Sequence, residues 1–208
     1  MGLPEIFISF QTAAVSAITR SARGVLAVAV KDATAGGATE AAYKSLAEVP
    51  EDKFSPENYR LLKLAFLAAP TKVWVLRVGE DAEKTYQALE RLRFDWLAAP
   101  GLEDARVMSF IKTLRNGGRG VKAVVANATA PDCEGIVNLC VSGLTLEDGA
   151  MEAKDYAVRV AALLAALPLT RSATYVNLPE VVGCDALAEP DEAVDAGKLI
   201  IVPGREGY

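Results

Sequence analysis

Histidine is absent from this chain of 208 residues, and cysteine is scarce, with only three residues. Because histidine is the commonest general base and metal ligand, its absence argues against most standard catalytic and metal sites. Cys133, Cys140 and Cys184 are odd in number and lack CxxC spacing, so neither a zinc site nor a full disulfide framework is indicated. We therefore expect a protein that is not an enzyme and that carries no cofactor or metal.

Blocks of basic residues and long apolar runs are missing as well. The net charge is −5, spread along the chain, which argues against nucleic acid and against anionic membranes as partners. The first ten residues, MGLPEIFISF, have no basic region ahead of their apolar residues, as a signal peptide would. The apolar run from Tyr156 to Leu167 stops at Pro168, well short of the roughly 20 residues of a membrane span.

Hydrophobic residues make up 51% of the chain, enough for a well-filled core. From Tyr156 to Leu167 the only polar side chain after the first position is Arg159, so a helix here has no face for water. A helix that is apolar all round lies between layers of protein when it is too short to span a membrane. This stretch therefore predicts a helix buried at the centre of the domain.

Strand-like and helix-like segments alternate along the rest of the chain, which is typical of a layered α/β domain. Ser55-Pro56 is a helix start signal, and 43–49 fits a short strand or a helical turn. We predict a three-layer α/β domain over residues 24–208, with a mixed, mostly parallel sheet. The predicted strands are 24–30, 43–49, 72–78, 94–97, 121–126, 136–141, 173–176 and 199–202; the predicted helices start at 55 and cover 81–93, 103–114 and 156–167, with a helical turn at 191–196.

The N-terminal segment alternates like a strand but has no hairpin partner next to it. Two interpretations are open: an edge strand of its own domain, or a donor arm that adds a strand to a neighbour's sheet. Ten extended residues reach roughly 33 Å, far enough to cross to another molecule. The candidate subunit-interaction residues are Pro4, Glu5, Ile6, Phe7, Ile8, Ser9 and Phe10.

Motifs that would carry chemistry are weak. The glycine-rich stretch 116–120 follows a predicted helix and precedes a strand, whereas a dinucleotide site needs a strand, then glycines, then a helix. In Asp132-Cys133-Glu134 the two carboxylates disfavour a thiolate, which argues against a nucleophilic cysteine. The acidic pairs Glu51-Asp52 and Glu147-Asp148 fall in predicted loops and are interpreted as solvated surface.

Several stretches, taken in order, resemble the tail sheath protein of contractile phage tails, most closely the type of Gram-positive prophages and phage-like particles. The resemblance runs over nearly the whole chain, and it rests on the order and spacing of the stretches together. They are MGLPEI and SF in the first ten residues, AVSAITRSARGVLAVAVKD (14–32), YKSLAEVPEDKFSPENYRLLKLAF (43–66), KVWVLRV (72–78) and RVAALLAALPLTRSATYVNL (159–178).

The resemblance implies a structural subunit that forms hexameric rings stacked around an inner tube and contracts to drive the tube through a target envelope. Residues 4–10 match the family's N-terminal arm, and 13–23 its linker, so the implied organisation is an arm and linker over 1–23 and an α/β domain over 24–208. The implied partners are other copies of the chain, the inner tail tube protein, and the baseplate and tail terminator proteins. The implied location is a virion tail or phage-tail-like particle, assembled in the host bacterial cytoplasm.

Members of the family continue into a C-terminal domain, and we expect that domain to be missing from these 208 residues. Two other functions are open. One is an α/β enzyme or small-molecule-binding domain, which predicts a concave pocket with convergent polar groups at the carboxyl ends of the strands. The other is a different structural tail or baseplate component.

Overall fold

A computed structural model of the chain describes residues 24–129, 132–168, 170–204 and 207–208. The predicted arm (4–10) and linker (13–23) lie outside the described residues, so both stay predictions. The elements, in chain order, are β1 (Val25–Val30), β2 (Glu40–Tyr43), η1 (Leu46–Glu48), η2 (Glu51–Lys53), α2 (Pro56–Leu67), β3 (Lys72–Arg77), α3 (Ala82–Arg91), β4 (Trp96–Ala98), α4 (Asp104–Asn116), β5 (Lys122–Ala126), β6 (Ile136–Cys140), β7 (Thr145–Leu146), β8 (Gly149–Ala150), α5 (Ala153–Ala166), β9 (Val181–Gly183), α6 (Pro190–Asp195) and β10 (Lys198–Ile200).

The main sheet has seven strands in the order β10-β6-β5-β4-β1-β3-β2. Every neighbouring pair is parallel except β2 and β3, which are antiparallel. A second sheet of three short strands, in the order β8-β7-β9, is antiparallel. The prediction of a mixed, mostly parallel sheet is confirmed.

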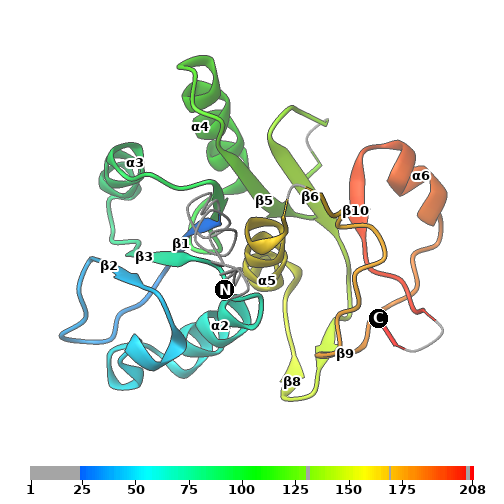
Figure 1. Cartoon of the computed structure of the whole chain (residues 1–208), viewed down its shortest axis with the longest axis horizontal. Helices are drawn as coiled ribbons and strands as arrows, with labels where there is room; N and C mark the ends of the chain where they lie inside the picture. Colours follow the sequence, from blue (N-terminus) through cyan, green and yellow to red (C-terminus); the bar gives the residue numbers. More distant parts are fainter. Residues whose placement is uncertain (1–23, 130–131, 169, 205–206) are drawn as a thin grey trace, which may run out of the picture.

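Helices cover both faces of the main sheet (Figure 1). Along β1, alternate side chains point to opposite faces: Leu26, Val28 and Val30 belong to the core cluster that includes α2 and α5, whereas Ala27 and Ala29 belong to the one that includes α3 and α4. A parallel strand buried on both faces needs such a continuous apolar run. The predicted three layers are therefore present.

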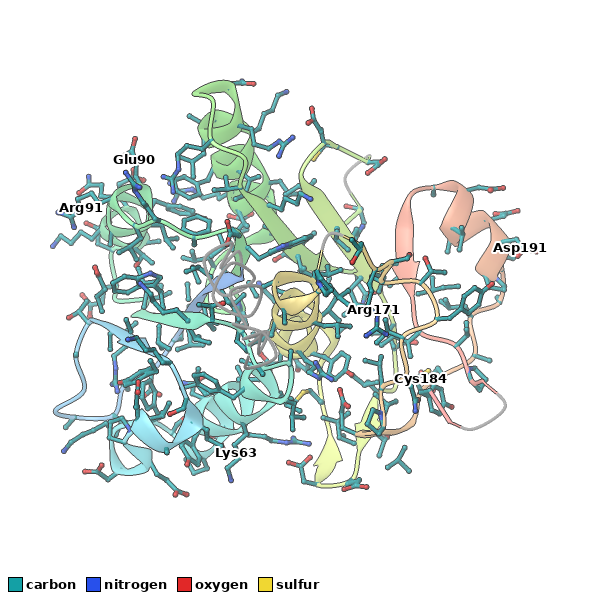
Figure 2. All side chains as sticks on the ribbon, in the orientation of Figure 1. Lys63, Glu90, Arg91, Arg171, Cys184 and Asp191 are labelled. Atoms are coloured by element: carbon teal, nitrogen blue, oxygen red, sulfur yellow. The ribbon has the colours of Figure 1, made fainter. Side chains whose placement is uncertain are left out.

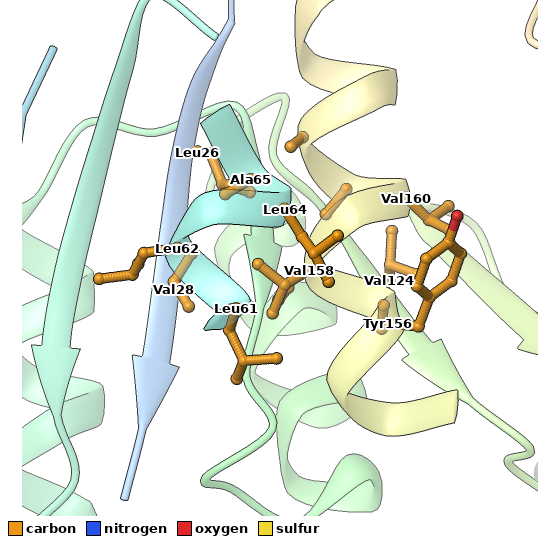
Figure 3. Close-up of a cluster of buried hydrophobic side chains, with 14 of the residues drawn as sticks. Leu26, Val28, Leu61, Leu62, Leu64, Ala65, Val124, Tyr156, Val158 and Val160 are labelled. Atoms are coloured by element: carbon orange, nitrogen blue, oxygen red, sulfur yellow. The ribbon is translucent and has the colours of Figure 1, made fainter. Parts of the chain in front are cut away.

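Helix α5 is the central element of the first layer. Its residues from Tyr156 to Ala162 are all buried, including Arg159. Figure 3 shows Val158 of α5 beside Leu61 and Leu64 of α2, and Val28 of β1 belongs to the same core cluster. Burying one such Val or Leu side chain stabilises the fold by about 1.5–3 kcal/mol. The predicted buried helix is confirmed.

Local signals set the helix starts where they were predicted. The hydroxyl of Ser55 accepts a hydrogen bond from the Asn58 amide (3.2 Å), and Pro56 occupies the first turn of α2. The carboxylate of Asp81 accepts from the Glu83 amide (3.0 Å) at the start of α3. Such caps satisfy amides that have no partner within the helix.

Of the two interpretations of 43–49, the helical turn is confirmed: only Tyr43 lies in a strand, the 3-10 helix η1 follows, and the Glu48 carboxylate accepts the Lys44 amide (2.8 Å). One predicted strand is wrong. Segment 173–176 contains no strand, because Tyr175 has a left-handed backbone (φ +58°) and is fully exposed. Conversely, segment 178–185, which is not among the predicted strands, includes β9, which pairs with β7.

None of the helices in the described part of the chain combines the length and the apolar character that crossing a bilayer requires.

Candidate functional site

The carboxyl end of the main sheet carries a cluster of converging polar groups. After β1 the chain forms β2, η1 and η2 and then α2 on one face of the sheet, while the loop after the neighbouring β4 leads to α4 on the other face. Ligands of open α/β sheets bind where adjacent loops diverge in this way. A ligand site of this kind would therefore lie at the ends of β1, β3 and β4.

Asp32, two residues past β1, has a fully buried side chain that joins the loop after β1 to the start of α2 and to β3. Its carboxylate accepts hydrogen bonds from the amides of Thr34 (2.8 Å) and Ser55 (3.0 Å) and from the side chain of Asn58 (2.8 Å). The Arg77 guanidinium lies 3.6 Å away. Burial works to raise the pKa of Asp32, but the hydrogen bonds prevail and lower it from 3.8 to about 2. Asp32 is thus an ionised anchor inside the fold.

The Arg77 guanidinium, beside Asp32, binds the backbone of two neighbouring segments. It donates hydrogen bonds to the carbonyl oxygens of Thr34 (2.7 Å) and Lys53, and it lies 4.8 Å from the ring centre of Phe54. The Asp32 carboxylate balances the charge of Arg77, whose hydrogen bonds connect the loop after β1 to η2. We assign the Asp32 cluster a structural role.

A hollow of about 710 Å³ lies beside Asp32, outside the ends of β1, β3 and β4. Its walls are the residues after β1, the β3–α3 loop, the loop before α4 and the first turns of α3 and α4. Gly101 lets the chain pass closely here, because a Cβ on it would lie 2.8 Å from the Lys31 amide nitrogen and 2.9 Å from the Val30 carbonyl carbon. The position agrees with the concave pocket that a small-molecule-binding domain predicts.

Tyr86 of α3 lines the hollow and has an unusual hydroxyl. The residue is only 6% exposed, and its hydroxyl has no hydrogen-bond partner among the described residues. The Arg106 guanidinium lies 5.2 Å from the centre of its ring. Burial raises the pKa of the Tyr86 hydroxyl, so the group keeps its proton and remains a donor at neutral pH.

A second buried polar cluster joins α5 to the segment before β9. Glu180 accepts hydrogen bonds from the Tyr156 hydroxyl (2.8 Å) and from Arg159 Nε (2.6 Å). Burial is the main cause that raises the pKa of Tyr156, and the Glu180 charge adds to it. Because this cluster lies in the core and lines none of the hollows described, we interpret it as a tether for the small sheet.

The acidic pairs and the cysteines that the sequence offers for chemistry do not come together in one site within the described residues. Asp148 is bound on the surface by the Arg60 guanidinium, which also donates to the carbonyl oxygens of Gly149 (2.9 Å) and Ala150 (3.0 Å) and so fastens the β7–β8 hairpin to α2. Within the described ranges, the three cysteines are free and half-buried, and no group of acidic or cysteine side chains has the arrangement of a metal site. Figure 2 shows charges of both signs around the surface, with Glu90 and Arg91 on α3 and Asp191 at the opposite end.

Comparison with known proteins identifies relatives of the whole chain. No family model matches it. The tail sheath protein of Clostridium phage phiCD119 is 32% identical over 219 residues, a match that covers 96% of this chain and 59% of the relative. The resemblance to tail sheath proteins is confirmed.

Solved structures of sheath tail proteins share the fold. The protein from Desulfitobacterium hafniense superposes with a TM-score of 0.77 at 15% identity, covering 99% of this chain and 73% of that one. The protein from Listeria innocua gives a TM-score of 0.75 at 17% identity, covering 92% and 69%. A chain in the anti-feeding prophage baseplate gives 0.62 at 11% identity, covering 100% and 66%. The α/β architecture is thus that of sheath tail proteins.

The chain spans about 59% of the length of the curated sheath relative it matches. The properties of a complete sheath protein therefore enter below as proposals. The predicted arm (4–10) lies outside the described residues, so the structure brings none of its side chains to a site.

Sequence reasoning missed the hollow, although a signal for it existed. Lys31-Asp32, Gly79-Glu80 and Gly101 each come directly or shortly after a strand predicted to be parallel. Because the carboxyl ends of parallel strands meet at one edge, these residues could have been grouped before the structure was known. Tyr86 lies in the helix predicted at 81–93 and is buried, but that its hydroxyl has no partner among the described residues follows only from the tertiary structure.

Proposed function

We propose that this chain is part of a structural subunit of a contractile tail sheath, which polymerises as stacked hexameric rings around an inner tube. The observation that carries the proposal is the 32% identity to a phage tail sheath protein over nearly all of this chain. The shared fold with sheath tail proteins supports it. The role is structural and non-enzymatic, and contraction would drive the tube through the target envelope.

The partners we propose are further copies of the same protein, the inner tail tube protein, and the baseplate and tail terminator proteins. The location is the virion tail or a phage-tail-like particle, with assembly in the host bacterial cytoplasm. The likeness to a chain in a prophage baseplate is compatible with a place in such a particle. Contraction would be rigid-body motion of packed domains on flexible connections, from an extended state that persists for kinetic reasons.

We assign residues 1–23 to an arm and linker and residues 24–208 to the domain body. In this proposal residues 4–10 add a strand to the sheet of a neighbouring subunit. Main-chain hydrogen bonds then supply affinity, and alternate side chains fit pockets on the acceptor. A second structural role, as a baseplate-attached component, would use the same contacts without long tubes.

Deletion of residues 1–10 from the natural gene product that carries this chain tests the arm. We expect folded subunits, with unchanged far-UV circular dichroism and melting temperature, that form no hollow cylinders in negative-stain electron micrographs. A matched control with Ala35→Ser, an exposed position of the loop after β1, should assemble normally. Cylinders of normal length from the deletion would refute the arm, and an unmodified product that never forms cylinders would refute the sheath.

A further inference from the structure

The C-terminal ends of α2 and α5 meet beside Gly24, at the start of β1. A Cβ added to Gly24 would lie 2.9 Å from the carbonyl oxygen of Ala165, in the last turn of α5, and 3.3 Å from Oγ1 of Thr71, in the connection after α2. The backbone is held here, because the amides of Gly24 and Val25 both donate to the Asp95 carboxylate, at 2.8 and 3.0 Å. The chain that precedes Gly24 therefore leaves the described domain directly beside these two helix ends.

The same helix ends carry apolar side chains and no cation. Leu67, in the last turn of α2, is 59% exposed, and Leu163 and Leu164 of α5 are half-buried. We call these three leucines the helix-end surface. Neither last turn contains a basic residue, although the carbonyl ends of helices favour cations. A segment that suits this surface would therefore combine apolar and basic side chains.

The segment that precedes β1 has this composition. Residues 11–23 contain two basic residues, Arg20 and Arg23, and no acidic one. Their largest apolar side chains are Val15 and Ile18. The six residues from position 18 to position 23 span roughly 20 Å when extended, whereas one turn of a helix rises about 5.4 Å. The apolar part of the segment can therefore reach the helix-end surface while its arginines stay beside the last turns.

The opposite face of the sheet suits the segment less well. There the Arg119 guanidinium already donates to the carbonyl oxygens of Glu90 (2.8 Å) and Leu92 (2.5 Å) at the end of α3. Arg91 and Arg93 are exposed at the same place. Two further arginines would meet like charges on that side, which is unfavourable. The distribution of charge thus favours the α2–α5 side.

We propose that residues 11–23 pack across the ends of α2 and α5 of their own domain, as a strap on the helix-end surface. Val15 and Ile18 rest on its leucines, and Arg20 and Arg23 face the carbonyl ends of the helices. The inference does not rest on the sheath proposal, because it concerns a single copy of the chain. It would fix the point from which the proposed arm extends.

Nuclear magnetic resonance of the full 208-residue chain tests the strap. Backbone ¹⁵N relaxation should give order parameters near 0.85 for residues 15–20, the value of rigid backbone, and the Ile18 methyl groups should show NOEs to those of Leu67, Leu163 or Leu164. Order parameters below 0.6 over residues 15–20, as in a flexible chain, would overturn the proposal.

Variants on both sides of the contact locate it. Leu67→Glu changes an exposed position of the domain and Ile18→Ser changes the strap itself, so each should lower the order parameters of the strap below about 0.6 while the melting temperature changes little. Val194→Glu is the matched control, because Val194 is also an exposed apolar residue, 54% exposed, on α6 at the far end of the domain (Figure 1). It should leave the strap rigid. A strap that stays rigid in Leu67→Glu would lie elsewhere, and the proposal would be refuted.

Discussion

Replacing Asp32 by asparagine should destabilise the domain in a way that depends on pH. The substitution keeps the shape of the side chain but removes its charge, and it turns one acceptor oxygen into a donor. At the Oδ2 position that donor would face the Ser55 amide and the Asn58 side chain, and at the Oδ1 position the Thr34 amide, all of which already donate to Asp32. The nearby Arg77 guanidinium would also lose its buried counter-charge.

The magnitude follows from the pKa of Asp32. A pKa lowered from 3.8 to about 2 corresponds to about 2.4 kcal/mol in the free energy of unfolding, since a tenfold change in an equilibrium constant is worth about 1.4 kcal/mol. Because the folded-state pKa lies below the unfolded one, this contribution is fully present above about pH 4. It is lost as the pH falls through 2. With the mismatched donor added, we expect Asp32→Asn to cost about 2–4 kcal/mol at pH 7.

Urea unfolding followed by circular dichroism at pH 7, 5, 3.5 and 2.5 measures the free energy of unfolding of the unmodified chain and of the Asp32→Asn variant. The unmodified chain should lose stability between pH 4 and pH 2.5 more steeply than the variant, so the difference between them narrows. Asp52→Asn is a matched control, because the Asp52 side chain is 72% exposed and its ion pair with Lys53 is a surface contact. We expect less than about 0.5 kcal/mol from it. A variant within about 0.5 kcal/mol of the unmodified chain at pH 7, or a constant difference across the pH range, would refute the role assigned to Asp32.

Two further predictions concern packing and a buried charge. Gly101→Ala should lower the free energy of unfolding by about 1–3 kcal/mol, because its Cβ would lie 2.8–2.9 Å from backbone atoms. Gly79→Ala is the control and should be neutral, because its Cβ would have no atom within 4 Å. Similar melting temperatures for the two variants would contradict the packing argument. Glu180→Ala should lower the free energy of unfolding by about 3–5 kcal/mol, because it leaves the Arg159 guanidinium buried without its partner. The double variant Glu180→Leu with Arg159→Met should recover most of that loss in urea unfolding. A double variant no more stable than Glu180→Ala would show that packing rather than charge explains the cost.

Much of the fold could be predicted because its signals are local. Residues 72–77 are apolar enough to need cover on both faces, and Ser55-Pro56 marks a helix start whatever surrounds it. The errors came where local preference and pairing disagree. Ala173 to Val176 has strand-forming side chains, yet no strand of the described residues pairs with it, and Tyr175 adopts a left-handed turn instead.

The candidate site was less accessible to prediction, because its groups come from separate parts of the sequence. Lys31, Tyr86 and Arg106 are tens of residues apart and meet only because β1 lies between β3 and β4. No periodicity encodes that strand order. The predicted arm, in contrast, rests on the sequence alone, and it stays a prediction for the assembly experiment.

Sequence by itself determined the class of the fold, the buried helix α5 and the relation to tail sheath proteins. Those properties follow from apolar periodicity and from residue identities in order, which the chain carries without reference to its shape. Tertiary structure alone decided the strand order, the buried ionised Asp32 and the hollow with its unpartnered Tyr86 hydroxyl. These depend on which distant segments exclude water from one another, and the free energy of burying a polar group is set by neighbours that only folding supplies.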